Sequence, residues 1–302
     1  MKSTMIIPPY LKKGDTVALV CTARKFTPEE AQPAIDLLKS WGLKAKLGAT
    51  IGLDNFQLGG SDTERAVDFQ AMLDDANIKA IWCARGGYGT VRIIDQIDFS
   101  RFTANPKWVM GFSDVTVLHS HIHTLGVATI HSVMPFSIPK ADPKAIESLK
   151  QALFGEKISY TIESSSLNKN GKAKGVLVGG NLSILYSLLG SESCLDTQDK
   201  ILYIEDLDEY LYHIDRMLMN LKRNGYFKNL KGLIVGGMTD MHDNSIPFGM
   251  DAYQIILDIT KEYTFPICFD FPAGHLPDNR ALVLGKEISL EVTDTLTKVD
   301  FL

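Results

Sequence analysis

Residues 80–89 read AIWCARGGYG and residues 108–115 read WVMGFSDV, and these two stretches decide the fold. Each begins with an apolar run of the length of a buried strand and then passes into glycine and polar residues. A helix is predicted after each of them, near Thr90–Ile97 and from Val115 to about Leu125. Strands that alternate with helices in this way indicate an α/β fold, with a parallel sheet covered by helices on both faces.

The same alternation extends to both sides of these two stretches. Thr27 and Glu30 form a capping-box pattern at the start of one further helix, and Asp62 can cap another. The additional strands are predicted at Thr16–Cys21, Lys44–Leu47 and Val127–Ile130, and the additional helices at Pro28–Trp41 and Asp62–Leu73. In such sheets a ligand binds beyond the carboxyl ends of the strands, where Gly86, Gly87 and Ser113 are expected to lie.

A polar, turn-rich stretch then interrupts the pattern and predicts a domain boundary. We expect an N-terminal domain over residues 1–160, a linker over 161–174 and a C-terminal domain over 175–302. Within the C-terminal domain, Lys200–Ile204 is predicted to be a strand that ends in Glu205 and Asp206. A long helix should follow, from about Tyr210 to Asn224.

Composition argues against several classes of partner. The 302 residues carry a net charge of −5, so no basic field attracts nucleic acid or an anionic membrane, and a small molecule is the expected partner. The four cysteines are far apart and form no C-x-x-C pair, which argues against disulfides and a zinc knuckle. No apolar run is long enough for a signal peptide or a membrane span, so we expect a cytoplasmic location.

Ser113 is a candidate nucleophile. It is predicted to lie at a strand-to-helix turn, which exposes a hydroxyl and directs backbone N–H groups to the same place. Gly111 matches the first glycine of the G-x-S-x-G nucleophile elbow, whereas Val115 stands at the position of the second. The alternative interpretation is an ordinary helix N-cap serine.

A catalytic serine needs a base and a group that orients the base. His275 follows an apolar strand in the irregular loop Pro272–Pro277, and Glu205 is predicted to stand at the mouth of a sheet. His275 could instead be an exposed loop histidine, and Glu205 could belong to a solvated acidic loop. The acidic residues that compete with Glu205 for the orienting role are Asp206, Asp208 and Glu209.

Two other patterns indicate weaker candidate sites. His119, His121, His123 and His131 suggest a metal site, but the glutamate of H-E-x-x-H is missing, and helix-surface or core histidines are favoured. Residues 85–89 are glycine-rich and follow a strand, yet they match neither nucleotide-binding glycine motif. We interpret them as a tight turn that lets backbone N–H groups approach a substrate oxyanion.

Six segments, in their order along the chain, resemble the LD-carboxypeptidase family, and the resemblance extends from the opening stretch Pro8–Asp15 over nearly the whole chain. The segments are Ala84–Gly89, Gly111–Asp114, Gly179–Leu182, Ile204–Asp206, Tyr212–Leu218 and Pro272–His275. The family often has tyrosine before the serine, where this chain has Phe112. That difference removes a hydroxyl and should leave the turn intact.

The resemblance implies a Ser–Glu–His triad with Ser113 as nucleophile, Glu205 as orienting carboxylate and His275 as base. It also implies an oxyanion hole made by the backbone N–H groups of Gly87 and Asp114. The implied fold is an N-terminal flavodoxin-like domain followed by a C-terminal domain of mixed, partly barrel-like β structure with helices. Arg85 is a candidate for binding the free carboxylate of the substrate, on the grounds of its charge and position.

The implied activity is hydrolysis of the L,D amide bond of cytoplasmic muropeptide tetrapeptides, with release of terminal D-alanine in peptidoglycan recycling. No metal or organic cofactor is implied, and the family suggests a homodimer. A related self-immunity peptidase that cleaves peptidyl- or aminoacyl-nucleotide antibiotics is an alternative, although the second half shows no obvious inserted loop to stack on a base. A non-enzymatic protein that binds a small ligand is a second alternative, because fold alone does not imply function.

Overall fold

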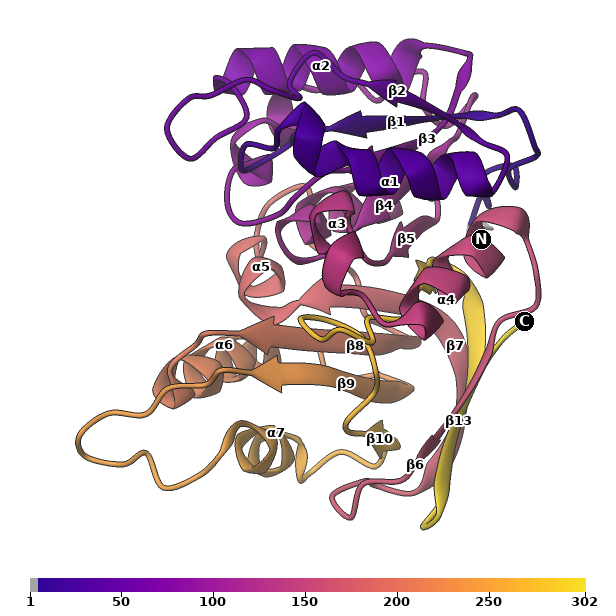
Figure 1. The fold of residues 1–302 in the computed structure, drawn as a ribbon. Coiled ribbons are helices and arrows are strands. Elements are labelled where there is room, and N and C mark those ends of the chain that lie inside the picture. The colour runs from indigo at the N-terminus through magenta and orange to yellow at the C-terminus, as the bar shows by residue number, and fades with distance from the viewer. Residues whose placement is uncertain (1–4) are drawn as a thin grey trace. The chain divides into compact units, whose positions relative to one another are not determined.

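The computed structural model describes residues 5–302 and shows two compact units (Figure 1). The first unit comprises the chain up to Lys157 together with Pro277–Gly285, and the second comprises Ile158–Leu276 and Lys286–Leu302. These boundaries differ from the predicted ones because residues in the expected linker 161–174 supply strand residues to the sheet of the second unit. In addition, a short late segment of the chain returns to the first unit.

The first unit is built on a six-stranded sheet. Its strands are β1 (Thr16–Val20), β2 (Lys44–Leu47), β3 (Ile78–Cys83), β4 (Trp108–Gly111), β5 (Thr129–His131) and β11 (Leu282–Leu284). They lie in the order β11-β5-β4-β3-β1-β2, and all pairs are parallel except β11 with β5. The order 2-1-3-4-5 is that of flavodoxin-like sheets, so the expected N-terminal fold is confirmed.

Among the described residues, the first unit has four α-helices, and the first three connect parallel strands of its sheet. They are α1 (Pro28–Ser40), α2 (Asp62–Asp74), α3 (Thr116–Thr124) and α4 (Pro143–Phe154), with short 3-10 turns η1 (Thr90–Arg92), η2 (Ile94–Gln96), η3 (Ser113–Val115) and η4 (Pro135–Lys140). The connection through α1 leads outward from β1 to β2, whereas α2 leads back past β1 to β3. Because such crossovers are right-handed, the two helices lie on opposite faces of the sheet.

The predicted helix starts are right for α1 and shifted for α2. Glu30 N donates to Thr27 Oγ1 at 3.2 Å and Thr27 N donates to Glu30 Oε2 at 2.8 Å, which is the expected capping box. Helix α2 is capped by Ser61 instead of Asp62, because Ser61 and Glu64 form a second capping box.

The predicted helix over 90–97 is wrong, since this segment forms the two short turns η1 and η2. Its backbone N–H groups are used differently from those of an α-helix. Thr90 N donates to the side chain of Asp114, and Ile93 N and Gln96 N donate to carbonyls three residues earlier.

The second unit contains a seven-stranded mixed sheet. Its strands are β6 (Ser159–Glu163), β7 (Gly171–Asn181), β8 (Lys200–Leu207), β9 (Gly232–Thr239), β10 (Ile267–Cys268), β12 (Glu287–Val292) and β13 (Leu296–Phe301). In the order β10-β9-β8-β7-β12-β13-β6, the pairs from β10 to β7 are parallel and the others are antiparallel. Figure 1 shows the sheet curling at β7, so that β13 and β6 run across the direction of β8 and β9. The expected mixed, partly barrel-like β structure is confirmed.

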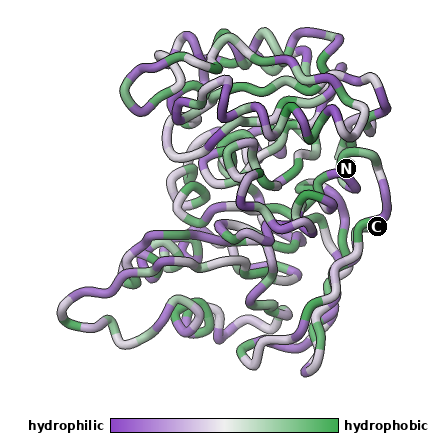
Figure 2. Tube along the Cα trace, in the orientation of Figure 1, coloured by the Kyte–Doolittle hydropathy of each residue, from purple (hydrophilic) through white to green (hydrophobic). Residues whose placement is uncertain are grey.

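Three helices pack on the parallel part of this sheet: α5 (Leu182–Ser187), α6 (Leu211–Arg223) and α7 (Ala252–Thr260). Helix α6 buries Ile214, Met217, Leu218 and Leu221 at the i, i+3, i+4, i+7 spacing of an amphipathic helix. These side chains join apolar residues of β8 and β9 in one core, and the strands appear as green segments in Figure 2. None of the helices in residues 5–302 combines the length and apolar character that a bilayer span requires.

Candidate active site

Ser113 lies at a strained turn directly beyond the carboxyl end of β4. Its φ is +61°, in the left-handed region that residues other than glycine rarely adopt, and it starts the 3-10 turn η3. Backbone strain of this kind costs about 1–3 kcal/mol and persists where the surrounding structure enforces it, commonly at functional sites. A strained strand-to-helix turn is also how a nucleophile elbow exposes its serine.

Two glycines make this turn possible. Gly111 has a φ of +151°, and a Cβ atom added there would lie 2.8 Å from Cγ2 of Val115. A Cβ atom on Gly86 would lie 3.2 Å from Cβ and 3.4 Å from Oγ of Ser113. The loop after β3 therefore passes directly against Ser113, which is possible because residue 86 has no side chain.

The predicted oxyanion donors are the backbone N–H groups of Gly87 and Asp114. In the described residues, neither Gly87 N nor Asp114 N donates to a carbonyl or side chain. Asp114 N is one of the orphan donors at the start of a helical turn, and Gly87 lies in the turn after β3 with a φ of +109°. Within the first unit, the hydroxyl of Ser113 likewise has no hydrogen-bond partner among the described residues.

A buried arginine that the sequence reasoning did not identify ties the loops of this site together. Arg65 of α2 is fully buried, and its Nη1 donates to the carbonyl oxygens of Thr22 at 2.5 Å and Gly89 at 2.9 Å. Thr90 N in turn donates to Oδ2 of the buried Asp114 at 2.9 Å. The loops after β1, β3 and β4 are thus held as one unit. The signal in the sequence was a charged residue on the helix face that carries Phe69 and Met72.

The second unit brings Glu205 and His275 together. His275 Nδ1 lies 2.7 Å from Glu205 Oε2, the Glu205 side chain is fully buried and His275 is 16% exposed. An ionised carboxylate is an acceptor only, so Nδ1 carries the hydrogen and donates it to Glu205. In the neutral ring the lone pair then lies on Nε2, which is the tautomer that a general base requires.

Glu205 lies inside strand β8 and not at its end, because parallel pairing with β9 continues through Leu207. The register with β9 shifts between Ile204 and Asp206, and a bulge of this kind re-aims a side chain next to a site.

The other three acidic candidates have different partners. Asp206 accepts from Asn181, Ser183 and Leu207, Asp208 bonds His242, and Glu209 bonds His213. Of the four acidic candidates, Glu205 is therefore the one with a hydrogen bond to His275, as expected for the orienting carboxylate.

The pKa of His275 is set by two opposing effects. Burial lowers it, but the negative charge of Glu205 and the hydrogen bond to it outweigh burial, so the pKa of His275 is raised from its ordinary value of 6.5. Burial, followed by the charge of Glu205, raises the pKa of Asp206 to about 7, against the lowering effect of its hydrogen bonds.

Gly274 allows Glu205 to reach His275. Its φ is +106°, and an added Cβ atom would lie 2.7 Å from Glu205 Oε2, the oxygen that accepts from His275. We expect Gly274→Ala to lower kcat by about 100-fold, because a displacement of about 1 Å of the predicted orienting carboxylate or base has an effect of this size. Gly225→Ala is the matched control, since its φ is +83° and nothing lies within 4 Å of the added atom. Steady-state kinetics that give equal losses for both variants would contradict this role.

Two of the four clustered histidines, His119 and His131, have hydrogen-bond partners in the core. His119 is buried, with Nδ1 2.8 Å from Thr129 Oγ1 and Nε2 2.9 Å from the carbonyl oxygen of Gly111, and burial lowers its pKa to about 3. His131 Nε2 lies 3.0 Å from Asn279 Oδ1. Across residues 5–302, no group of three or more His, Cys, Asp or Glu side chains is arranged to hold a metal ion. His119 and His131 are core histidines.

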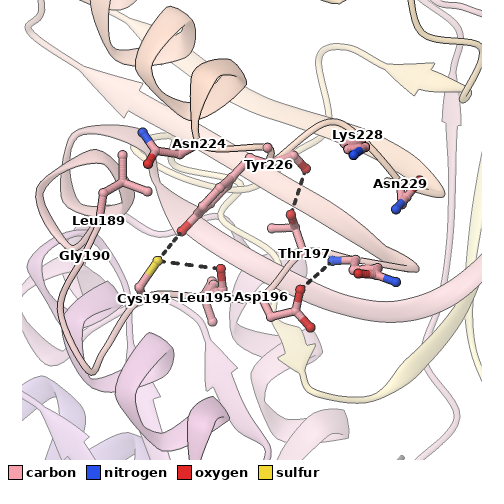
Figure 3. Close-up of a pocket in the computed structure, with 12 residues that line it drawn as sticks. Leu189, Gly190, Cys194, Leu195, Asp196, Thr197, Asn224, Tyr226, Lys228 and Asn229 are labelled. Atoms are coloured by element: carbon pink, nitrogen blue, oxygen red, sulfur yellow. Dashed lines mark hydrogen bonds between the residues drawn. The ribbon is translucent and has the colours of Figure 1, made fainter.

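A separate pocket of about 210 Å³ lies in the second unit, near the amino end of β8 and the end of α6 (Figure 3). Cys194 Sγ lies 3.6 Å from the hydroxyl of Tyr226 there, and Thr197 Oγ1 donates to the carbonyl of Tyr226 at 2.7 Å. Burial raises the pKa of Tyr226 well above its ordinary value, so its hydroxyl stays neutral and cannot act as a base. The lining contains no histidine, and the pocket lies away from the Glu205 end of β8.

Comparison with known proteins is consistent with this geometry. The family model for the LD-carboxypeptidase N-terminal domain matches residues 17–132, and that for the LD-carboxypeptidase C-terminal domain matches residues 174–290. The chain belongs to the LD-carboxypeptidase family. It is 35% identical to a probable murein peptide carboxypeptidase of Bacillus subtilis, over 97% of this chain and 94% of that protein.

Solved structures of low sequence identity share the fold of this family member. Muramoyltetrapeptide carboxypeptidase from Oxalobacter formigenes superposes with a TM-score of 0.86 at 23% identity, covering 95% of this chain and 98% of that one. The microcin C7 self-immunity protein MccF, in complex with aspartyl sulfamoyl adenosine, also gives 0.86, at 21% identity, covering 98% and 99%. The muramoyltetrapeptide carboxypeptidase and the self-immunity protein therefore have the same fold as this chain.

Proposed function

We propose that this chain is a serine carboxypeptidase that hydrolyses the L,D amide bond of cytoplasmic muropeptide tetrapeptides and releases terminal D-alanine. The observation that carries the proposal is the 2.7 Å hydrogen bond between His275 Nδ1 and the buried Glu205. It is supported by the strained turn that holds Ser113 and by membership of a carboxypeptidase family.

In the proposed first half-reaction, Ser113 Oγ attacks the carbonyl carbon of the L-centre of the diamino acid. His275 Nε2 accepts the serine proton, and the N–H groups of Gly87 and Asp114 donate to the oxyanion that forms. The tetrahedral intermediate then collapses and its C–N bond breaks. His275 gives its proton to the nitrogen of the departing D-alanine, which leaves an ester on Ser113.

In the second half-reaction, water attacks the ester while His275 accepts a proton from it. The ester bond to Ser113 breaks, the tripeptide leaves with a new carboxylate, and the serine regains its hydrogen from His275. Glu205 holds the ring in one tautomer throughout and stabilises the imidazolium form without being protonated.

The raised pKa of His275 predicts how the rate depends on pH. Only the neutral ring can accept the serine proton, so kcat/KM should rise with pH and reach a plateau above a midpoint that exceeds 6.5. The measurement is D-alanine release between about pH 5 and pH 9 at low substrate concentration. A midpoint below 6.5 would show that Glu205 does not raise the pKa of the catalytic base.

One assay separates the proposed function from its rivals. Purified protein is incubated with a muropeptide tetrapeptide and, in parallel, with an aminoacyl sulfamoyl adenosine, and the products are identified by mass spectrometry. Release of D-alanine from the tetrapeptide is the expected result. Cleavage of the nucleotide conjugate alone would favour the self-immunity peptidase, a rival supported by the likeness to MccF. Binding without cleavage of either would favour the non-enzymatic alternative. The expected homodimer stays a prediction.

A further inference from the structure

Two arginines of the first unit, Arg24 and Arg85, form no ion pair with any residue that the structure describes. Among residues 5–302, neither side chain makes an ion pair or a hydrogen bond. Arg24 is exposed and Arg85 is half-buried. The guanidinium carbon of Arg85 lies 4.0 Å from the centroid of the Phe136 ring, which holds the cation in place over an aromatic face.

Both arginines lie next to the turn that carries Ser113. Gly86 contacts Ser113, as its added Cβ atom would lie 3.2 Å from Cβ of that residue. An added Cβ atom on the next residue, Gly87, would lie 2.6 Å from Cδ and 2.7 Å from Nε of Arg24. The residue before Gly86 is Arg85 itself. Consecutive Cα atoms are about 3.8 Å apart, so both cations belong to the immediate surroundings of the Ser113 turn.

The position of this pair in the sheet is one where ligands bind. Arg24 follows β1 and Arg85 follows β3, and these neighbouring strands flank the point where the chain order reverses. In open parallel sheets, ligands bind outside the carboxyl ends of the strands at such a switch point. Ser113 follows β4, which is the next strand of the sheet.

The charges around the pair favour an external anion. Burial, and then the positive charge of Arg24, lower the pKa of Arg85, so the two cations repel each other. The carboxylate of Glu30 acts on the pKa of Arg85 in the opposite sense, but its Oε2 accepts from Thr27 N at 2.8 Å in the capping box of α1. A bound carboxylate would relieve the repulsion between the two guanidinium groups, each of which presents donors in a planar fork.

We propose that Arg24 and Arg85 bind the free C-terminal carboxylate of the peptide substrate. This rests on the proposed function and adds the determinant that would restrict cleavage to the last residue. In a tetrapeptide, the terminal carboxylate carbon is three covalent bonds from the carbonyl carbon that Ser113 would attack. A cation beside the Ser113 turn is therefore within reach of the carboxylate while the scissile carbonyl is in place.

The test compares a muropeptide tetrapeptide ending in D-alanine with the same peptide ending in D-alaninamide. For the wild type, kcat/KM should favour the free acid by roughly 100-fold or more, because hydrogen bonds to a charged group are lost in the amide. In the double variant Arg24→Gln/Arg85→Gln this ratio should fall toward one. Lys25→Gln is the control: it removes a neighbouring cation whose ammonium group already bonds Asp54 at 2.6 Å, and it should keep the wild-type ratio.

The result that overturns the proposal is a double variant that keeps the wild-type ratio, whatever its absolute rate. A binding measurement makes the test independent of turnover. Calorimetric titration of the Ser113→Ala variant should give tighter binding of the acid than of the amide, and adding the two arginine substitutions should abolish the difference. Equal binding of acid and amide by Ser113→Ala would also overturn it. Absence of D-alanine release by the wild type would instead count against the proposed function.

Discussion

Ser113→Ala is expected to lower kcat for D-alanine release by about 10⁴-fold or more, because the substitution removes the only atom that can form the ester. The residual rate would come from substrate binding and the oxyanion donors alone. Alanine has no greater difficulty than serine in the left-handed backbone of this turn, so the fold should be retained. The measurement is single-turnover release of D-alanine, quantified by mass spectrometry.

Two controls accompany this variant. Ser137→Ala replaces another serine of the same unit and should stay within about threefold of the wild-type rate, as is usual away from a site. The thermal midpoint of Ser113→Ala should lie within about 3 °C of the wild type, which separates lost chemistry from lost structure. Near-normal turnover by a folded Ser113→Ala protein would remove Ser113 from the mechanism.

Glu205→Gln should lower kcat by about 10³- to 10⁴-fold with little change in the volume of the side chain. The amide can donate toward Nδ1 of His275, which favours the wrong tautomer and places the lone pair away from Nε2. The loss of charge has a second consequence. Burial lowers the pKa of His275, and this effect would no longer be outweighed, so the midpoint of the pH–rate profile should move to a more acidic pH.

The chain offers a matched control for this substitution. Glu209 also bonds a histidine through Nδ1, at 2.5 Å to His213, in the same unit. Glu209→Gln should therefore leave the rate within about threefold of the wild type and the pH profile unmoved, as expected for a site outside the chemistry. Equal losses in the two variants would mean that Glu205 acts through the structure in general and not through His275.

The parallel sheet of the first unit could be predicted because its parallel strands, apart from the edge strand β2, are almost entirely buried and are separated by glycine and polar residues. The start of α1 could be predicted because Thr27 and Glu30 form a capping box within four residues of sequence. The start of α4 could have been predicted as well, since Asp142 caps it and Pro143 stands at its first position. The return of residues 277–285 to the first unit was not predictable, because it depends on pairing between β11 and the distant β5.

The residues of the candidate site also differ in this respect: some are indicated by a local sequence pattern, and others only by contacts between distant segments. Ser113 was singled out by a local turn pattern, and the structure adds the left-handed φ that no pattern could supply. The choice of Glu205 among four acidic residues depends on a hydrogen bond across 70 positions of sequence. Arg24 and Arg65 could not be identified from the sequence. Their roles depend on contacts between loops that lie side by side only after β1, β3 and β4 pair.

In the proposed mechanism Ser113 and His275 act as one catalytic unit, and a double-mutant cycle tests this most directly. The rates of D-alanine release by Ser113→Ala, His275→Ala and the double variant are measured under identical conditions. If the two residues act together, the double variant should be no slower than either single variant, because each substitution already abolishes the same step. Losses that multiply in the double variant would show that the two side chains contribute independently, and would contradict the proposed triad.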